Sequence, residues 1–227
     1  MMKDLARDPH FDPAIQVRPL SQSIVYNAVF KRIFDILVVL AILPVLLPLL
    51  ALLWLLVRQD GGPGFYSQPR IGRDGTTFKF WKLRTMVVNA DEALATLCAN
   101  NCELAREWAR DQKLAHDPRI TPLGRILRAT SLDELPQALN VLRGEMSLVG
   151  PRPFMADQAR LYRAAGGRAY FALRPGITGL WQIYGRGRTS FADRVHFDEA
   201  YHAGLGLFLD CRLIFLTAGV VLGRTGQ

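Results

Sequence analysis

Two adjacent carboxylates, Asp133 and Glu134, are the side chains in this 227-residue sequence that are best suited to chemistry. Because adjacent carboxylates repel each other, their placement is favourable only with a cation or a metal ion beside them. Magnesium fits that requirement, since Mg²⁺ binds through one or two carboxylates together with substrate phosphates. Arg128 precedes the pair closely and is within reach in sequence. The pair therefore predicts a site that takes Mg²⁺ and a phosphate-bearing ligand.

The same segment also has a purely structural interpretation. Ser131 and Glu134 have the spacing of a capping box, and acidic residues near helix N-termini are ordinary stabilisers. Pro136 weakens this interpretation, because with Ser131 as the cap it would be the fifth helical residue, where an N–H is already needed. We therefore expect the helix to begin later, at about Leu135, which leaves the acidic pair at its mouth.

Two later motifs present single arginines on loops rich in proline and glycine. In the segment 150–153, prolines on both sides of Arg152 fix the backbone around the guanidinium, which suits the clamping of a phosphate. In the segment 174–179, Arg174 supplies charge, and the glycines allow the backbone to approach a ligand closely. Taken alone, each motif also fits an ordinary structural turn.

The distribution of charge favours an anionic partner. The formal net charge is +8, and after residue 57 there are 23 Lys and Arg against 16 Asp and Glu, with arginine making up 20 of the 23 cations. The planar guanidinium suits phosphate oxygens, which favours phosphate-bearing ligands or anionic lipid. A nucleic acid or a solvated basic face would share this signature. The three cysteines have no paired spacing, so disulfide and zinc sites are not expected.

The segment 36–57 carries no charge, and its 22 residues are enough to cross a hydrocarbon core of roughly 30 Å as a helix. Pro44 and Pro48 lie near its centre, where each removes an N–H donor and should kink or break the helix. Basic residues stand just before the segment and at Arg58 just after it, which favours a cytoplasmic position for both ends. A re-entrant helix allows that placement, but the pattern alone leaves a kinked span open as well.

The elements that must position these residues form a mostly helical α+β chain. Strands are expected at 65–71 and 76–82, around an Asp74-Gly75 turn that favours a tight hairpin. The helices follow from capping signals, stop signals and apolar residues at helical spacing. They are one from the capping box of Asn89 and Glu92 to Trp108, one starting at Thr121-Pro122, one over 135–143 that Gly144 ends, and an interfacial or core helix at 205–222.

Six motifs occur in an order that resembles the bacterial sugar transferase family of monotopic polyprenyl-phosphate phosphoglycosyl transferases. The resemblance runs from about residue 31 to the end of the chain, and six ordered motifs are far more specific than any one of them. The motifs are Lys31-Arg32-Ile-Phe-Asp35, Gln68-Pro-Arg70-Ile-Gly72, Lys82-Leu-Arg84-Thr85-Met86, Asp133-Glu134-Leu-Pro136-Gln137, Gly150-Pro151-Arg152-Pro153 and Arg174-Pro175-Gly176-Ile177-Thr178-Gly179.

The resemblance implies an activity, a cofactor and a topology. The enzyme would transfer a sugar 1-phosphate from a UDP-sugar to polyprenyl (undecaprenyl) phosphate and release UMP, as the first membrane step of glycoconjugate or exopolysaccharide assembly. Asp133 would be the nucleophile that forms an aspartyl phosphosugar, and Glu134 would help to hold Mg²⁺. A re-entrant membrane helix would hold the protein on the cytoplasmic face of the bacterial inner membrane. One departure is that Leu47-Pro48 stands where the family usually has Ser-Pro at the break.

Together these observations predict three parts and a set of substrate contacts. Residues 1–28 form a loosely ordered arm, 29–58 the re-entrant membrane helix, and 59–227 a small cytosolic domain with a short hairpin and amphipathic interfacial helices. The expected substrate-binding residues are Lys82, Arg84, Arg128, Gln137, Arg152 and Arg174.

Two functions of other classes compete with this reading. A membrane-tethered binding protein for nucleic acid or anionic lipid explains the arginine surplus and the apolar segment, but not an acidic pair beside them. A catalytically silent assembly scaffold does not explain the pair either. We therefore expect a UDP-sugar, polyprenyl phosphate and the lipid bilayer as partners, and no nucleic acid. The sequence defines neither the sugar nor whether the chain forms a homo-oligomer.

Overall fold

The computed structural model describes residues 26–111, 114–185 and 189–222. Within these ranges the chain is mostly helical with two small two-stranded sheets, which confirms the α+β class that the sequence predicts. The predicted arm at 1–28 lies outside the described residues except for its last three positions, which belong to the helical turn η1 (Tyr26–Phe30).

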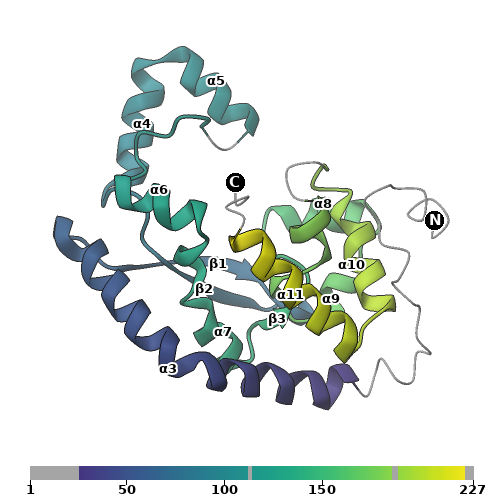
Figure 1. Ribbon diagram of the computed structural model, residues 1–227. Helices are drawn as coiled ribbons and strands as arrows, with labels where there is room; N and C mark the ends of the chain where they lie inside the picture. Colours follow the sequence, from purple (N-terminus) through teal and green to yellow (C-terminus); the bar gives the residue numbers. More distant parts are fainter. Residues whose placement is uncertain (1–25, 112–113, 186–188, 223–227) are drawn as a thin grey trace.

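The apolar segment forms one long helix, α3 (Lys31–Val57), which continues through Pro44 and Pro48. The prolines therefore do not interrupt the helix, and Figure 1 shows instead that α3 bends along its length. Among the described residues it is the one helix that is long and apolar enough to cross a membrane.

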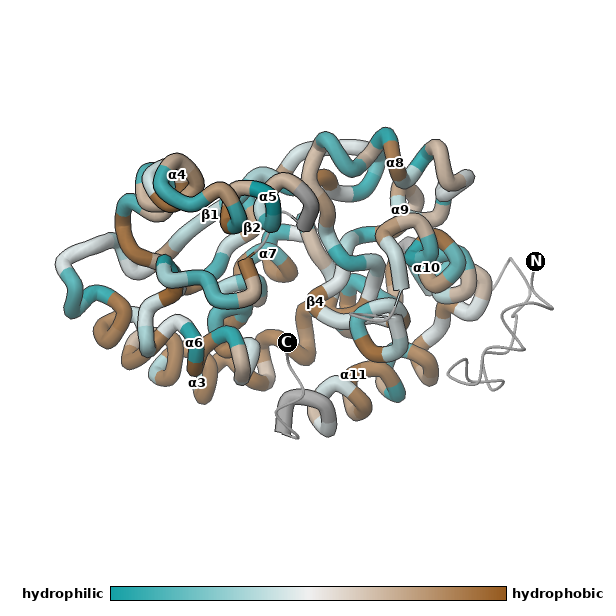
Figure 2. The backbone as a smooth tube through the Cα atoms, turned by 90° about the horizontal axis from the view of Figure 1, so that it is seen from above, coloured by the Kyte–Doolittle hydropathy of each residue, from teal (hydrophilic) through white to brown (hydrophobic). Residues whose placement is uncertain are grey.

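One stripe of α3 packs on the rest of the protein, while its other faces are exposed. Val39 and Leu46 belong to a core cluster that includes Phe78 and Phe80. On the outer faces large apolar side chains stand free, with Val45 74% exposed. Figure 2 shows the brown, hydrophobic colour along much of this helix. Contiguous apolar surface of this kind marks contact with a membrane or another partner.

Both ends of α3 are tied to the same folded body. At its start, Lys31 Nζ donates to Asp210 Oδ2 at 2.6 Å, and both side chains are buried. At its end, Arg84 Nη2 donates to the carbonyl of Val57 at 3.0 Å. The helix therefore lies along the domain instead of leaving it at one end.

The predicted antiparallel hairpin is formed by β1 (Phe65–Ile71) and β2 (Thr77–Leu83). Asp74 and Gly75 have φ values of 58° and 77°, the left-handed backbone that an Asp-Gly turn supplies. Directly opposed residues of antiparallel strands point to the same side, so the register decides which side chains share a face. The pairs on one face are Tyr66 with Lys82, Gln68 with Phe80, and Arg70 with Phe78.

The amphipathic stretch after Asn89 forms two helices, α4 (Ala90–Asn100) and α5 (Cys102–Asp111), so the prediction of one helix is wrong. The break lies at Asn101, which has extended backbone and whose Oδ1 accepts from the N–H of Glu103 at 2.9 Å. Asn101 thus caps a second helix. The predicted side-chain cap at Asn89 is absent, because that residue makes no capping hydrogen bond.

Three short elements carry the acidic segment. Helix α6 (Pro122–Ala129) begins as predicted, with the hydroxyl of Thr121 accepting a backbone N–H in its first turn. Helix α7 (Gln137–Arg143) ends at Gly144, whose φ of 81° gives the left-handed cap that was expected. Between them lies the 3-10 turn η4 (Leu132–Glu134).

A parallel pair of short strands, β3 (Ser147–Val149) and β4 (Gly176–Thr178), joins the two proline-glycine loops and is not predicted by the sequence pattern. A Cβ atom at Gly176 would lie 2.0 Å from the backbone nitrogen of Gly150. These glycines therefore let two backbones approach each other, which corrects the expectation that they make room for a ligand.

The helices that follow β3, from α8 to α11, lie together beside this strand pair (Figure 1). Phe208 and Phe215 of the last helix are 69% and 77% exposed, whereas Leu213 is buried in the core with Tyr201. The last helix is thus apolar on its exposed side as well as on its buried side, which suits contact with a membrane or another partner. The remaining elements are η2 (Arg58–Asp60), η3 (Arg73–Gly75), α8 (Gln158–Ala164), α9 (Ala169–Ala172), η5 (Trp181–Gly185), α10 (Arg194–Ala203) and α11 (Leu207–Leu222).

Candidate active site

The acidic pair lies in the turn η4, directly before the residues that open α7. Ser131 makes no side-chain capping hydrogen bond, so the structural interpretation of this segment as a capping box does not hold. Its φ is instead 57°, a left-handed value that is uncommon for residues other than glycine. Backbone in such regions is held in place by its surroundings and clusters at active sites and ligand clamps.

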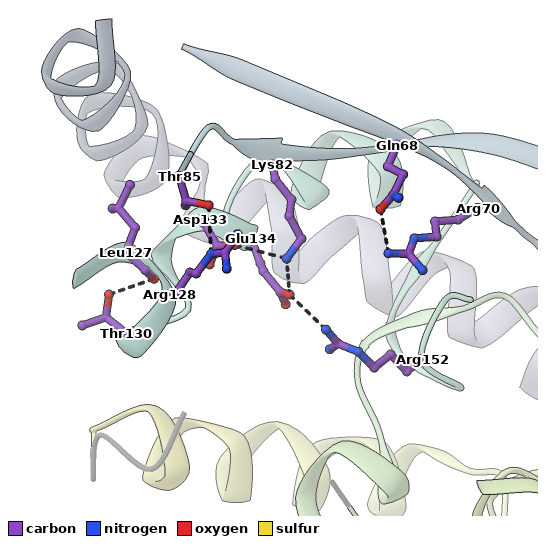
Figure 3. A network of polar contacts seen from close by, with 10 residues as sticks. All are labelled: Gln68, Arg70, Lys82, Thr85, Leu127, Arg128, Thr130, Asp133, Glu134 and Arg152. Carbon is purple, nitrogen blue, oxygen red and sulfur yellow. Dashed lines mark hydrogen bonds and ion pairs between the residues drawn. The ribbon is translucent and has the colours of Figure 1, made fainter. Parts of the chain in front are cut away.

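Lys82 supplies the cation that the two carboxylates require. Its Nζ lies 3.1 Å from Oδ2 of Asp133 and 2.8 Å from Oε1 of Glu134 (Figure 3). One ammonium thus holds both carboxylates at once, which offsets their mutual repulsion. Among the described residues, no donor contacts the other oxygen of Asp133, Oδ1.

These three side chains are mostly buried, and their exposed fraction increases from Asp133 to Glu134 to Lys82. The side chain of Asp133 is 7% exposed, that of Glu134 is 16% exposed, and that of Lys82 is 25% exposed. Charges that are largely withdrawn from water interact more strongly than charges on the surface. The site is therefore desolvated at the carboxylate end and open at the ammonium end.

The loop after β3 brings a guanidinium to the same place. Nη2 of Arg152 lies 3.5 Å from Oε1 of Glu134, so Glu134 faces two cations. The flanking prolines fix this loop, as the sequence predicts. Arg152 is 25% exposed and offers further N–H donors to a ligand.

Arg194 holds this loop in place, although the sequence pattern does not single it out as a site residue. The guanidinium donates to the backbone carbonyl of Arg152. It is buried under aromatic rings, with its Cζ 5.3 Å from the Phe154 ring and 5.0 Å from the Phe191 ring. Its ion-pair partner is Asp198, one helical turn later, at 3.8 Å. The spacing of these two charges in α10 is the sequence signal that could have found the pair.

Arg128 lies in the last turn of α6, and its Nε donates to Oγ1 of Thr85 at 2.9 Å. Thr85 follows β2, so this bond joins the end of the strand that carries Lys82 to the helix before the acidic turn. Figure 3 shows Arg128 on the same side of the network as Thr85. No other hydrogen bond from Arg128 is formed to the described part of the chain, so its remaining donors can serve a phosphate.

Arg84, which was expected to bind substrate, has a different role. Its Nε donates to the carbonyl of Pro63 at 2.7 Å, and its four other N–H groups go to both oxygens of Asp60 and to two more carbonyls. All five donors of the guanidinium are therefore engaged inside the protein. Arg84 joins the end of α3 to the hairpin, and none of its five donors is left for a ligand in this arrangement.

Gln137 and Arg174 also lie away from any described contact with the acidic pair. Gln137 is 1% exposed, and its Nε2 is a buried donor without a hydrogen-bond partner among the described residues. Nε of Arg174 donates to the carbonyl of Gly144 at 3.0 Å. Burial lowers the pKa of Arg174, and the positive charges of its neighbours Arg73 and Arg32 lower it further. Arg174 therefore lies near Arg32 at the start of α3, and no contact with the acidic pair is described for it.

Arg70 is a second residue near the site to which the sequence analysis gives no role, although it belongs to one of the six motifs. Its Cζ lies 5.6 Å from the centre of the Phe80 ring, and Nζ of Lys82 lies 5.5 Å from the same ring. Burial lowers the pKa of Arg70, and the charge of Arg152 lowers it further. The alternation of the strand was the available signal, since it places Arg70 and Lys82 on one face.

The residues present fit a magnesium ion that is shared with a substrate. Among the described residues, no group of three or more His, Cys, Asp or Glu could hold a metal without help. Asp133 and Glu134 converge on one cationic position, at the ammonium of Lys82. Two carboxylate ligands completed by phosphate oxygens are the usual coordination of Mg²⁺ in phosphoryl-transfer sites.

Comparison with known proteins shows which family the chain resembles. The family model described as bacterial sugar transferase matches residues 26–224. The undecaprenyl-phosphate galactose phosphotransferase of Salmonella typhimurium is 47% identical over 196 residues, which cover 86% of this chain and 41% of that protein. The exopolysaccharide production protein ExoY of Rhizobium meliloti is 44% identical over 225 residues, which cover 98% of this chain and 96% of that protein.

A more distant relative is the UDP-glucose:undecaprenyl-phosphate glucose-1-phosphate transferase of Escherichia coli, 38% identical over 199 residues that cover 84% of this chain. Several of these relatives are much longer proteins. The chain spans 41–42% of the length of three of them that match it at 46–49% identity.

Proposed function

The chain belongs to the bacterial sugar transferase family, and from this premise we propose that it transfers a sugar 1-phosphate from a UDP-hexose to undecaprenyl phosphate. The observation that carries the proposal is the pair Asp133 and Glu134, held by the one ammonium of Lys82 and flanked by Arg152. The names of the relatives include both galactose and glucose transferases, so the hexose is left to experiment.

In the first step, an oxygen of Asp133 attacks the phosphorus that bears the sugar. A bond forms between the carboxylate oxygen and this phosphorus, the phosphoanhydride bond breaks, and UMP leaves with the electron pair. Oδ1 suits the attack, since Lys82 contacts Oδ2 and positions the carboxylate through it. Lys82 and Arg152 lie where negative charge builds up on the diphosphate and stabilise it.

In the second step, an oxygen of undecaprenyl phosphate attacks the same phosphorus. The bond to Asp133 breaks, the carboxylate is restored, and the product is the lipid-linked sugar diphosphate. Two displacements at one phosphorus constitute covalent, ping-pong catalysis. The carboxylate is largely withdrawn from water, which limits hydrolysis of the intermediate before the lipid arrives.

Mg²⁺ bound at Glu134 and Asp133 would neutralise charge on the diphosphate and orient it. Lys82 would then shift from bridging the carboxylates to contacting a phosphate oxygen, which its flexible stem allows.

The position of α3 supports a re-entrant placement on the cytoplasmic face of the inner membrane. A helix of 27 residues is about 40 Å long, so a spanning helix would carry one end out of reach of the cytosolic domain. Both ends of α3 contact that domain, through Lys31 and through Val57. Cysteines introduced at Phe30 and Gln59 in sealed inverted vesicles should both react with an impermeant maleimide, and protection of one of them would contradict the placement.

The activity is tested by UMP release from a panel of UDP-sugars with undecaprenyl phosphate in detergent. UDP-galactose and UDP-glucose are compared directly. Asp133→Asn, incubated with donor labelled in the sugar, should retain its fold and carry no covalent label. Labelled protein in that variant would remove Asp133 from the role of nucleophile, and the absence of UMP from every donor would reject the proposed activity.

A further inference from the structure

An open pocket of about 350 Å³ lies along β1. Side chains of β1 form one wall, and the segment after the loop of Arg152 forms the other. The acidic pair itself does not line this pocket. The residues used in the argument are Tyr66, Gln68, Arg70, Met155, Ala156 and Asp157.

Arg70 connects the pocket with the acidic pair. It lines the pocket, and its Cζ lies near the Phe80 ring, which Nζ of Lys82 also approaches. The side chain is held in this position by Gln68, whose Oε1 accepts from Nη2 at 2.8 Å. Figure 3 shows Arg70, Arg152 and Lys82 arranged around the space in front of Glu134.

The guanidinium of Arg70 has no carboxylate partner among the described residues. Gln68 takes one of its five donors, and Nε is buried without a hydrogen bond. Glu134 is already shared between Arg152 and Lys82, and Asp157 of the pocket wall acts on Arg70 electrostatically without forming an ion pair with it. A partly buried cation that has no ion-pair partner and lies beside another arginine is stabilised when a ligand supplies the negative charge.

The remaining walls of the pocket suit a nucleoside better than a second charged group. The exposed ring of Tyr66 offers a face for a base to stack on, and the carboxylate of Asp157 can accept hydrogen bonds from ribose hydroxyls. Met155, which adapts well to a planar ring, lies 3.4 Å from Nε2 of Gln68 through its sulfur.

We propose that this pocket holds the nucleoside of the donor and that Arg70 binds the phosphate which departs with it as UMP. The inference rests on the proposed function and extends it. The donor would run from Asp133, at the phosphorus that bears the sugar, past Arg152 and Arg70 to the pocket. Arg70 is thereby assigned to the leaving nucleotide, and Lys82 and Arg152 to the transferred phosphate.

Double-displacement kinetics provide a selective test. In such a scheme, kcat/KM for each substrate reports only on its own half-reaction. Arg70→Gln should lower kcat/KM for the UDP-sugar about 10- to 100-fold, the range for losing one charge-assisted hydrogen bond, and leave kcat/KM for undecaprenyl phosphate unchanged. The inhibition constant of UMP against the donor should rise by the same factor.

Arg163→Gln is the matched control. Arg163, like Arg70, lies over an aromatic ring, that of Phe171, but it is exposed and does not line the pocket. It should leave all three constants unchanged. A second variant, Ala156→Trp, fills the pocket from an exposed position without removing a charge and should weaken UMP in the same way.

The outcomes separate this inference from the proposed activity. If the wild-type protein releases UMP and both pocket variants bind UMP as the wild type does, the pocket assignment is wrong and the activity stands. If Arg70→Gln lowers both kcat/KM values equally, Arg70 supports the site as a whole and the assignment to the leaving nucleotide fails. If the wild type turns over no UDP-sugar, calorimetry with UMP on the same variants still decides whether the pocket binds the nucleotide.

Discussion

Lys82 and Arg84 stand two residues apart at the end of β2, yet they belong to regions with opposite properties. The ammonium of Lys82 lies between two carboxylates in a site that is partly open. The guanidinium of Arg84 lies in what we call the α3 clamp, formed with Asp60 and the carbonyls of Val57, Pro63 and Met86. Both residues come from one motif, and both were expected to bind substrate.

The difference lies in how many donors the protein has already used. Every N–H group of Arg84 is engaged internally, so the residue contributes to stability and has nothing to offer a ligand. Arg152 and Arg70 have most of their donors uncommitted among the described residues. Internal engagement of donors thus separates structural cations from binding cations in a chain with a surplus of arginine.

The largest effect on stability is expected at Arg194, an internally engaged arginine like Arg84. Arg194→Met leaves Asp198 buried without its partner and should lower the free energy of unfolding by about 3–5 kcal/mol, the cost of breaking a buried ion pair. Thermal or urea unfolding in detergent, followed by circular dichroism, measures the change. Loss of less than one third of that amount would mean that the pair contributes little.

The pH dependence of this variant sharpens the test. Burial raises the pKa of Asp198 to about 7. A carboxyl whose pKa is raised in the folded state contributes stability below its unfolded pKa and loses that contribution as pH rises through the folded value. Arg194→Met removes a charge that lowers this pKa, so the pKa rises further and the variant should go on losing stability above pH 7, where the loss in the wild type levels off. The double variant with Asp198→Asn should lose this dependence.

The second effect concerns catalysis and is expected at Lys82, the partly exposed cation of the acidic pair. Lys82→Met leaves Asp133 and Glu134 adjacent without their shared ammonium, and kcat should fall about 100- to 1000-fold, as for removal of a preorganised donor. Lys82→Arg, which keeps the charge, is the control and should retain part of the rate. UMP release at saturating donor measures both variants. An unchanged rate in Lys82→Met would place the catalytic charge elsewhere.

The sequence predicted local features of the fold well, because local chemistry determines them. The Asp74-Gly75 turn, the Thr121 cap and the stop at Gly144 were all predicted from the preferences of single residues. The break at Asn101 was missed because apolar spacing continues on both sides of a residue that ends one helix and caps the next.

Contacts between distant segments could not be predicted in the same way. Arg84 finds its carboxylate at Asp60, 24 residues earlier, and the parallel pairing of β3 with β4 joins two loops that look like isolated turns. The sequence shows that residue 84 is a cation that can bind phosphate, but it does not show how many acceptors surround the guanidinium in the fold. The same limit applies to Arg174, whose charge suits a phosphate but whose guanidinium is held at Gly144.

The third effect should separate the α3 clamp from the acidic pair. Arg84→Gln removes the bonds to Asp60 and to the carbonyl of Val57 and should lower the free energy of unfolding by about 2–3 kcal/mol. The folded fraction should keep its KM for the UDP-sugar, because no donor of Arg84 is available to the substrate. Activity is therefore measured per folded molecule, after separation by size-exclusion chromatography. A raised KM at unchanged stability would return Arg84 to the substrate site.

The smallest effect is expected at Arg58, one residue beyond α3. Its guanidinium is exposed and stacks on Trp54, with Cζ 4.8 Å from the ring centre. Arg58→Ala should therefore cost only about 0.5–1 kcal/mol, the value of an exposed cation–π contact. The same unfolding assay that is used for Arg84→Gln compares two arginines at one end of one helix. Arg58 lies at the same end of α3 as Arg84 but lacks its hydrogen-bond acceptors. Equal losses of stability in the two variants would therefore mean that the location beside α3, and not the number of engaged donors, determines the stabilisation.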